Sequence, residues 1–505
     1  MAKVRLQRAP GVEEPLDAVE LAGLALTRAA GGPAIEGNAA RLLRDAAENF
    51  PAWKSAIAGA QRSILFECYI FADDPIGREF AALLAERARA GVKVAVVVDW
   101  LGSWSSLRVW DDVRAAGGQV RVFNPPRLSS PLGWLSRDHR KTIVVDGTIG
   151  FVSGLCVSQL WVGDPARKLE PWRDTGIEIR GPAIAALEAA FAEVYGSCGG
   201  APFPEALMTP ADAMKRAGDV RMHVVANEPN VAGTFRMDLI VASIARRNLW
   251  LTDAYFVGTT PYVQALRAAA RDGVDVRLLV PGSSDIPALS PLSRAQYRPL
   301  LEAGVRVFEW NGTMLHAKTA VADGIWSRVG STNLNLASWL SNYELDVAVE
   351  DRSFAERLAA QYEEDLTNST EIVLTPRNRV RRADAPMESV QSTRRGQARR
   401  APSGSAGRAA AGAVSVGSAL GAALTDRRAL GPAEAGLLFI MSVTAVVVGL
   451  IAALWPRVLA WPLAVIAIWF GAAWAAKAYA LRRDARAGRY PVVDVDDLRG
   501  GGGRT

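Results

Sequence analysis

The sequence predicts an α/β fold made of two similar halves, each expected to be an α/β/α sandwich in which helices flank a mixed sheet. Two observations carry this prediction. Short apolar tracts typical of strands alternate with helix-like segments over residues 37–375, and both the order of these elements and one eight-residue pattern occur twice. Two long uncharged runs near the C-terminus add a transmembrane helical hairpin to the expected architecture.

The repeated pattern is His-x-Lys-x4-Asp followed by Gly. It begins at His139 in the first copy (HRKTIVVDG) and at His316 in the second (HAKTAVADG), and the chain has only three histidines. Side chains two positions apart share one face of a strand, so each histidine is expected to point the same way as the lysine that follows it. An imidazole beside a cation suits an anionic substrate, so the pair of patterns predicts a phosphate site with two proton-transfer groups.

The candidate catalytic residues are the histidine, lysine and aspartate of each pattern. They are His139, Lys141, Asp146, His316, Lys318 and Asp323. The two aspartates directly precede Gly147 and Gly324, where bracing a turn is the more ordinary role for such a residue. The third histidine, His223, belongs to no motif and is interpreted as structural.

The first half is expected over residues 37–215, after an unpatterned N-terminal extension at 1–36. Its elements, in order, are a helix at 40–60, a strand at 64–71, a helix at 77–90, a buried strand at 92–99, a strand at 119–123 and the strand of the first pattern.

The second half, residues 216–375, repeats that order. Its expected elements are a helix at 240–247, strands at 249–256, 274–280 and 305–310, a helix at 262–271 and the strand of the second pattern. Glu67-x-Tyr69 in the first half also corresponds to Asp253-x-Tyr255 in the second. The patterns lie 177 residues apart, which indicates an internal duplication rather than a solenoid. The halves are therefore expected to pack so that the two patterns meet.

The character of the chain changes after residue 375. A basic linker rich in Arg, Ala, Gly and Ser is expected at 376–432, a two-helix hairpin at 433–480 and a basic, Gly-rich tail at 481–505. Residues 435–455 carry no charge and, as a helix, would span about 30 Å, the thickness of a hydrocarbon core. The alternative is a helical hairpin buried in a protein core.

Basic residues indicate how this hairpin would be oriented. Arg427 and Arg428 precede it and Lys477 begins a basic stretch after it, whereas its loop has Arg457 alone. The positive-inside rule then places both flanks, and with them the candidate site, on the cytoplasmic side of a bacterial-type inner membrane. The three cysteines are scattered without C-x-x-C spacing, so neither a disulfide framework nor a zinc site is expected. No signal peptide is expected at the N-terminus.

The paired patterns resemble the signature of the phospholipase D superfamily. Stretches such as 67–74 (ECYIFADD), 98–103 (VDWLGS) and 171–175 (PWRDT) are most similar to bacterial cardiolipin synthases, and the resemblance covers residues 37–375. It implies transfer of a phosphatidyl group between alcohols, typically phosphatidylglycerol giving cardiolipin. The resemblance further implies a phosphohistidine intermediate, with neither a metal nor another cofactor.

The resemblance also implies roles for residues outside the two patterns. Residues 330–333 match the family's G-S-x-N, so Ser331 and Asn333 are expected to donate hydrogen bonds to the phosphate. Glu344 and, by position, Asp174 are expected to orient the histidines, with Glu67 as a further carboxylate behind the site.

The first half departs from the family pattern at one of these positions. Gly154 is expected to line the phosphate site, but Cys156 stands where the family has an asparagine, and a thiol is a weak hydrogen-bond donor.

Several functional alternatives remain open at this stage. The same intermediate accepts an alcohol or water, so a phospholipase D that forms phosphatidic acid is the main alternative to a synthase. A phosphodiesterase acting on nucleic acid is disfavoured by the hairpin, and an inactive membrane scaffold by the intact histidines. The residues leave open which histidine is the nucleophile, although family analogy favours His139, and they leave open the oligomeric state.

Overall fold

The computed structural model describes residues 18–126, 136–210, 214–286, 293–374 and 380–382, with single helical positions between 446 and 479. The chain divides into a large unit that contains both patterns and a small unit formed by residues 125–134 and 435–505. The expected linker, hairpin and tail lie almost wholly outside the described residues. Within those residues, no helix has both the length and the apolar character required to cross a bilayer. The following description concerns the large unit.

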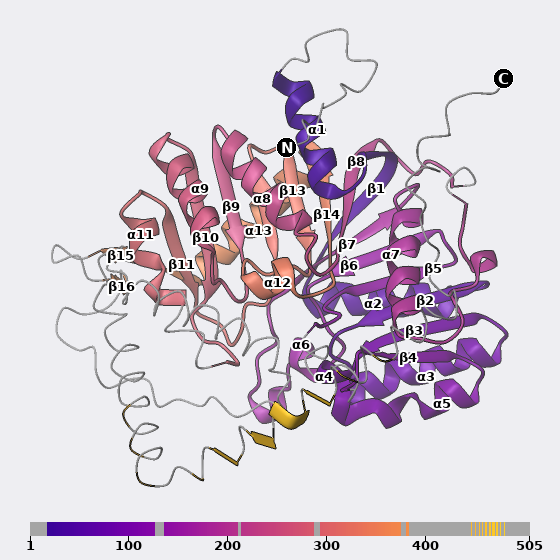
Figure 1. Ribbon diagram of the computed structural model, residues 1–505. Helices are drawn as coiled ribbons and strands as arrows, with labels where there is room; N and C mark the ends of the chain where they lie inside the picture. Colours follow the sequence, from indigo (N-terminus) through magenta and orange to yellow (C-terminus); the bar gives the residue numbers. More distant parts are fainter. Residues whose placement is uncertain are drawn as a thin grey trace, which may run out of the picture. The chain divides into compact units, whose positions relative to one another are not determined.

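One sheet of sixteen strands runs through the described part of the large unit (Figure 1). From the middle outward, the first half contributes β1 (Ile35–Arg44), β7 (Thr175–Arg180), β6 (Ile149–Ser153), β5 (Lys141–Val145), β2 (Ser63–Cys68), β3 (Lys93–Asp99) and β4 (Gln119–Phe123). The second half contributes β8 (Val220–Asn227), β14 (Glu344–Glu350), β13 (Trp326–Gly330), β12 (Thr319–Ala322), β9 (Asn248–Thr252), β10 (Asp275–Pro281) and β11 (Arg306–Trp310), extended by β15 (Ser369–Leu374) and β16 (Val380–Arg382).

The two halves follow the same strand order away from their junction. They meet where β1 pairs with β8 in antiparallel fashion. In each half the three strands β2-β3-β4 or β9-β10-β11 are parallel, and the strands that lead from them to the junction are antiparallel. The expected mixed sheet is therefore present. Equivalent strands of the two halves occupy equivalent positions in the strand order, counted from the middle of the sheet.

Helices cover the sheet in layers. The helices described are α1 (Ala18–Ala30), α2 (Asp45–Gly59), α3 (Pro75–Arg89), α4 (Trp100–Ser103), α5 (Asp111–Ala115), α6 (Gln159–Val162), α7 (Ile184–Ser197), α8 (Gly233–Ile244), α9 (Thr260–Arg271), α11 (Tyr297–Leu301), α12 (Leu336–Leu340) and α13 (Arg352–Thr367). The structure also describes the 3-10 segments η1 (Trp104–Trp110), η3 (Pro165–Arg167) and η4 (Glu205–Leu207). One core cluster lies beneath α2 and α3, and another lies beneath α1, α8 and α9.

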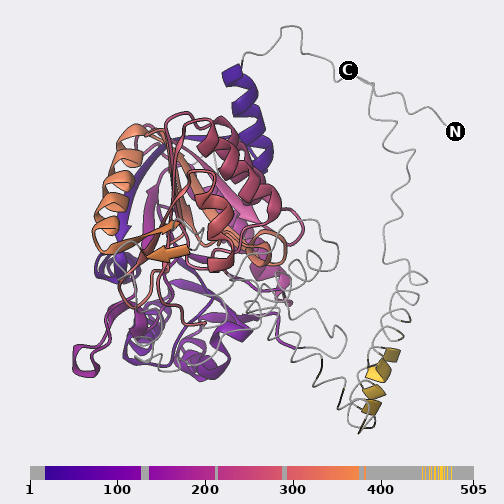
Figure 2. The same ribbon diagram turned by 90° about the vertical axis from the view of Figure 1, so that its left-hand side faces the viewer.

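A third core cluster is shared by the two halves. It combines Val144 and Ile177 of the first half with Val329 and Leu345 of the second, and α7 and α13 both contribute to it. These helices cross the junction, because α7 also packs on β8 and α13 also packs on β1. Figure 2 shows α13, in orange, running beside the strands of the sheet. The halves are thus joined by apolar packing as well as by the β1–β8 ladder.

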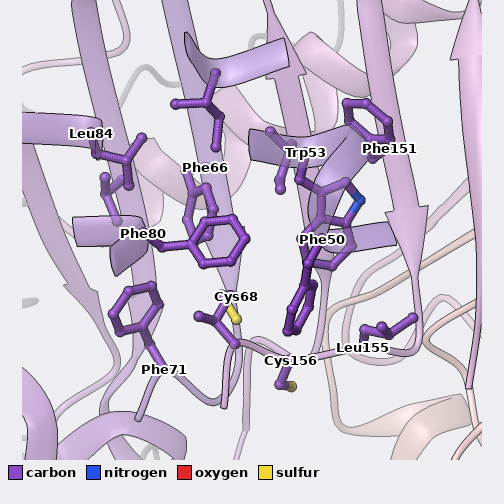
Figure 3. Packing of buried hydrophobic residues seen from close by; sticks show 14 of the residues in the cluster. Phe50, Trp53, Phe66, Cys68, Phe71, Phe80, Leu84, Phe151, Leu155 and Cys156 are labelled. Atoms are coloured by element: carbon purple, nitrogen blue, oxygen red, sulfur yellow. The ribbon is translucent and has the colours of Figure 1, made fainter. Parts of the chain in front are cut away.

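Local sequence signals explain the crossover helices. The Asp74 carboxylate accepts a hydrogen bond from the Gly77 amide, and Pro75 occupies the first turn of α3, which are both favourable features of a helix N-terminus. The apolar face of α3 carries Phe80 and Leu84 onto the aromatic cluster shown in Figure 3. Phe80 meets the ring of Phe50 edge to face at 5.4 Å between centroids.

The structure corrects several expected elements. Residues 40–44 belong to β1 rather than to a helix, and the helix that follows begins only at Asp45. The sequence AARLLR in β1 has helical periodicity, but pairing on both sides in the middle of the sheet decides its conformation. The N-terminal extension contains α1, which packs against α8 through Leu26 and Ala29. The strand expected at 249–256 ends at Thr252.

The two pattern aspartates lie at the ends of β5 and β12 that are remote from the histidines. Asp146 adopts a left-handed backbone conformation, with φ of 54°, and its carboxylate accepts hydrogen bonds from the amides of Gln61, Arg62 and Ser63 at 2.7–2.8 Å. Asp323 does the same, with φ of 53°, for the three amides that begin at Arg246. These contacts correct their placement among the catalytic residues, because each carboxylate instead fixes the start of the neighbouring strand.

Replacing Asp146 with alanine is therefore expected to destabilise the fold without removing a catalytic group. Loss of an acceptor for three amides should lower the free energy of unfolding by about 2 kcal/mol. Chemical denaturation would measure this loss. Asp73→Ala is the control, because among the residues that the structure describes Asp73 pairs only with the exposed Arg78. An Asp146→Ala protein as stable as the control would contradict the bracing role.

Candidate active site

The two histidines lie on short extended segments that lead into equivalent strands. The first strand, β5, begins at Lys141, and β12 begins at Thr319, so each histidine precedes its strand rather than belonging to it. Each leading segment is hydrogen-bonded to the opposite half. The amide of His139 donates to the carbonyl of Tyr343 at 2.9 Å, and the amide of His316 donates to the carbonyl of Arg173 at 2.7 Å. Backbone hydrogen bonds thus join the two halves at the candidate site.

This exchange brings each imidazole to a carboxylate of the other half. His139 Nδ1 lies 2.9 Å from Glu344 Oε2, and His316 Nδ1 lies 2.8 Å from Asp174 Oδ2. Both carboxylates are completely buried. A hydrogen bond from Nδ1–H to a carboxylate fixes the tautomer and leaves the Nε2 lone pair available. The structure therefore brings together the histidines and the two carboxylates expected to orient them.

Burial determines the charge state of the histidines. It lowers the pKa of His139 to about 4, although the charge of Glu344 opposes this shift. Burial, reinforced by the Lys318 charge, lowers the pKa of His316 to about 3, with Asp174 opposing. Both imidazoles are therefore neutral at pH 7, so each can act as a nucleophile or as a base.

The two lysines lie beside these imidazoles. The Lys141 ammonium donates to the carbonyl of His139, and the Lys318 ammonium donates to the carbonyl of His316. Lys318 Nζ also lies 2.9 and 3.0 Å from the two ring nitrogens of His316. Burial lowers the pKa of Lys318 to about 8, and the charge of Lys141 contributes. Two buried cations so close together favour the binding of an anion.

Aromatic rings that the sequence analysis did not assign to the site contact both histidines. The Tyr69 ring meets His139 edge to face at 4.8 Å between centroids, and the equivalent Tyr255 meets His316 at 5.8 Å. Trp161 and Trp172 contact His316 as well, at 5.3 and 5.7 Å. The correspondence between Glu67-x-Tyr69 and Asp253-x-Tyr255 is the signal that could have identified the tyrosines.

The residues expected to bind phosphate occupy different environments. The Ser331 hydroxyl donates to Glu344 Oε2 at 2.6 Å and accepts from the Leu345 amide at 2.9 Å, so its single proton supports the carboxylate instead of facing a substrate. Asn333 is buried, and its side-chain oxygen has no hydrogen-bond partner among the described residues. A phosphate oxygen accepts hydrogen bonds, so binding by Asn333 would use its amide NH2 group, and this role stays a prediction.

The first half lacks an equivalent ligand. The amide of Gly154 donates a hydrogen bond to the Thr175 carbonyl at 3.2 Å. A Cβ atom on Gly154 would lie 2.2 Å from Asp174 Oδ1. Glycine at this position thus makes room for the carboxylate, which corrects its expected role as a substrate contact. Burial raises the pKa of the Cys156 thiol, but the hydrogen bond with Cys68 and the charge of Lys141 outweigh it and bring that pKa to about 7.

Glu67, expected as a further carboxylate behind the site, lies on the face of the sheet opposite to Lys141. It lies opposite Thr142 in the β2–β5 ladder, whereas Lys141 lies opposite Cys68, so Glu67 and Lys141 are on different faces of the sheet. Burial raises the pKa of Glu67 to about 7, although the charge of Arg140 opposes this shift. The corresponding Asp253 accepts hydrogen bonds from the amides of Leu334 and Tyr255 and so holds the segment after Asn333.

Known proteins are similar to the part of the chain that contains this site. A family model described as "Cardiolipin synthase, PLD-like domain" matches residues 54–159 and 240–366, which include both histidine patterns. Cardiolipin synthase A of Pseudomonas aeruginosa is 34% identical over 393 residues, covering 76% of this chain and 79% of that protein. A cardiolipin synthase of Halalkalibacterium halodurans is 32% identical over 341 residues, covering 66% and 67%.

A solved structure shares the fold. The crystal structure of phosphatidylserine synthase from Haemophilus influenzae matches with a TM-score of 0.55 and 14% identity, over 70% of this chain and 92% of that one. At this level of identity the match concerns the fold alone.

The protonation states lead to a direct test. At pH 6 the imidazoles of His139 and His316 are expected to be neutral and protonated on Nδ1, because burial holds both pKa values below that pH. In Glu344→Gln the pKa of His139 should fall further, since the removed charge is the one that opposes burial. Nitrogen NMR of histidine-labelled protein measures both quantities. A His139 ring protonated at pH 6 in the unmodified protein would contradict the inferred state.

Proposed function

We propose a function from the premise that this chain belongs to the cardiolipin synthase family of phospholipase D-like proteins. The proposed reaction transfers a phosphatidyl group from one phospholipid to an alcohol. The expected donor is phosphatidylglycerol and the expected product is cardiolipin. The observation that carries the proposal is the pair of buried histidines, each bound through Nδ1 to a carboxylate of the opposite half and each beside a lysine.

The first chemical step uses the Nε2 atom of one histidine. This nitrogen attacks the phosphorus of the donor, a P–N bond forms, and the bond from phosphorus to the leaving glycerol oxygen breaks. The other histidine gives its proton to that oxygen. For this it must first be protonated, and the negative charge of a bound phosphodiester, placed between the lysines, raises the pKa of a nearby imidazole. Glu344 or Asp174 then stabilises the imidazolium through Nδ1.

The second step reverses the proton transfers. The histidine that lost its proton takes one from the incoming alcohol, whose oxygen attacks phosphorus as the P–N bond breaks. Lys141, Lys318 and Asn333 are proposed to bind the non-bridging oxygens, where negative charge is concentrated during both steps. Which histidine forms the P–N bond is left to experiment, with His139 as the expectation.

The surroundings of His316 support an alcohol rather than water as the acceptor. The rings of Trp161, Trp172 and Tyr255 lie around its imidazole, and the side chain of His316 is only 5% exposed. Rings that exclude water from a reactive intermediate slow its hydrolysis. A phospholipase D that releases phosphatidic acid is the alternative outcome.

The uncharged runs at 435–455 and 458–476 are proposed to anchor the enzyme in a bilayer. Each is long enough for one crossing, and Trp455, Trp461 and Trp474 stand near the ends of the runs, where tryptophan is favoured. The basic flanks support a hairpin with the catalytic region on the cytoplasmic side of a bacterial-type inner membrane. A hairpin of this kind would keep the active site beside its lipid substrates.

The proposed reaction is tested by incubating the purified protein with phosphatidylglycerol in detergent micelles and separating the products. Cardiolipin and glycerol in equal amounts are expected. His139→Ala and His316→Ala should each lose at least a thousandfold in kcat, because each removes a group that breaks or forms a bond to phosphorus or transfers the proton.

The matched control is His223→Ala. His223 lies on β8, with its ring nitrogens 3.3 Å from the Gly32 carbonyl and from a carboxylate oxygen of Glu350, and it should retain activity. Phosphatidic acid as the sole product would establish the hydrolase instead. Turnover that survives in either pattern variant would overturn the two-histidine scheme.

The anchor is tested on membranes from cells that express the full chain. An integral hairpin should remain in the pellet after washing with carbonate at pH 11, because alkali removes only proteins held at the surface. As a matched control, a variant with Val447, Ile451 and Val465 changed to Asp should be released, since charge in the middle of each run opposes insertion. Release of the unmodified protein would sink the proposed anchor.

A further inference from the structure

We infer that Trp161 is a positioning residue for His316, acting through Asp174, and that its indole N–H replaces a serine hydroxyl used in the other half of the molecule. The inference rests on the proposed function, in which His316 is one of the two reacting groups. It concerns a residue that belongs to neither histidine pattern.

The second half shows how a carboxylate is held in place. Glu344 Oε2 receives two donors, the Nδ1 of His139 at 2.9 Å and the hydroxyl of Ser331 at 2.6 Å. Ser331 is itself fixed by the Leu345 amide, which donates to its hydroxyl oxygen at 2.9 Å. The carboxylate oxygen that orients His139 is therefore held by a second donor from a neighbouring strand end.

The first half cannot use the same device. The position equivalent to Ser331, counted from the histidine pattern, is Gly154, which has no hydroxyl. A side chain could not be added there without moving the carboxylate, because a Cβ atom at Gly154 would lie 2.2 Å from Asp174 Oδ1. The Thr175 amide donates to Asp174 Oδ1 at 2.8 Å, so a second donor to Oδ2, the oxygen that orients His316, must come from elsewhere in the fold.

Trp161 supplies that donor. Its Nε1 atom donates to Asp174 Oδ2 at 2.9 Å, and the same oxygen receives His316 Nδ1 at 2.8 Å. Trp161 is fully buried, on a short helix, α6, that begins where the Ser158 hydroxyl accepts from the Leu160 amide. The pattern of two donors on one carboxylate oxygen thus recurs in the first half with a different donor.

The indole also affects the charge of the dyad. Burial raises the pKa of Asp174, but its interaction with His316, the Lys318 charge and the Trp161 hydrogen bond outweigh it and keep that pKa low. An ionised Asp174 is needed to stabilise His316 when the imidazole carries a proton. Since Asp174 is completely buried, water is poorly placed to replace the indole donor.

The test is Trp161→Phe, which removes the indole N–H and retains an aromatic ring against His316. We expect kcat for the transfer to fall about tenfold or more, with KM changed less than about twofold, because the loss affects the orientation of a reacting group rather than lipid binding. Without the indole donor, the carboxylate becomes more basic and holds the His316 proton more strongly. The limb of the pH–rate profile that His316 controls should therefore move to higher pH.

The matched control is Trp53→Phe. Trp53 is also a buried tryptophan, its Nε1 atom has no hydrogen-bond partner among the described residues, and its ring packs on Phe50, Phe80 and Phe151. It should retain the kcat and pH profile of the unmodified enzyme. Trp161→Met is a second variant that keeps much of the volume and likewise lacks a donor, so the test stands if either variant folds. Thermal unfolding identifies the folded variants.

A folded Trp161 variant with kcat within twofold of the unmodified enzyme and an unchanged pH profile would overturn the inference. An equal loss of kcat in Trp53→Phe would overturn it as well, since the effect would then come from core packing. Failure of the inference is distinct from failure of the proposed function. An unmodified enzyme without transferase activity would remove the function, whereas an active enzyme that is insensitive to Trp161 would remove the inference alone.

Discussion

The candidate active site depends on the exchange of histidine–carboxylate pairs between the halves. His139 is oriented by Glu344 and His316 by Asp174, so neither half holds a complete dyad. The exchange requires the β1–β8 ladder and the shared core beneath α7 and α13 to keep the halves in register. A duplicated chain satisfies that requirement within one molecule, because the partner surface is always present. The site therefore forms only when the junction between the halves is intact.

Burying this set of charges has a cost that an anionic substrate would offset. Each carboxylate is paired with an imidazole, but Lys141 and Lys318 lie close enough for the charge of one to lower the pKa of the other. A phosphodiester between them would add a negative charge beside the lysines and favour protonation of an imidazole. Such pre-arranged charge, in a place from which water is largely excluded, is an effective means of stabilising a transition state.

The sequence predicted the duplicated, mixed α/β architecture and the histidines and carboxylates that the structure brings together, because these residues lie in recognisable patterns. It missed β1, whose helical periodicity was overridden by pairing on both sides. It could not place Glu67, since one step along β2 decides which face of the sheet a side chain occupies. The Ser331–Glu344 contact and the rings around His316 depend on long-range packing, about which spacing along the chain carries little information.

The two halves differ at positions that surround the dyads. The second half keeps Ser331 and Asn333, whereas the first has Gly154 and Cys156 at the corresponding positions. In compensation, the first half provides Trp161 as a donor to Asp174 and, with Trp172, an aromatic wall beside His316. Polar groups therefore gather near His139 and aromatic groups near His316. Equal dyads in unequal surroundings are suited to unequal tasks, because forming a bond to phosphorus and transferring a proton to an alkoxide make different demands on an imidazole.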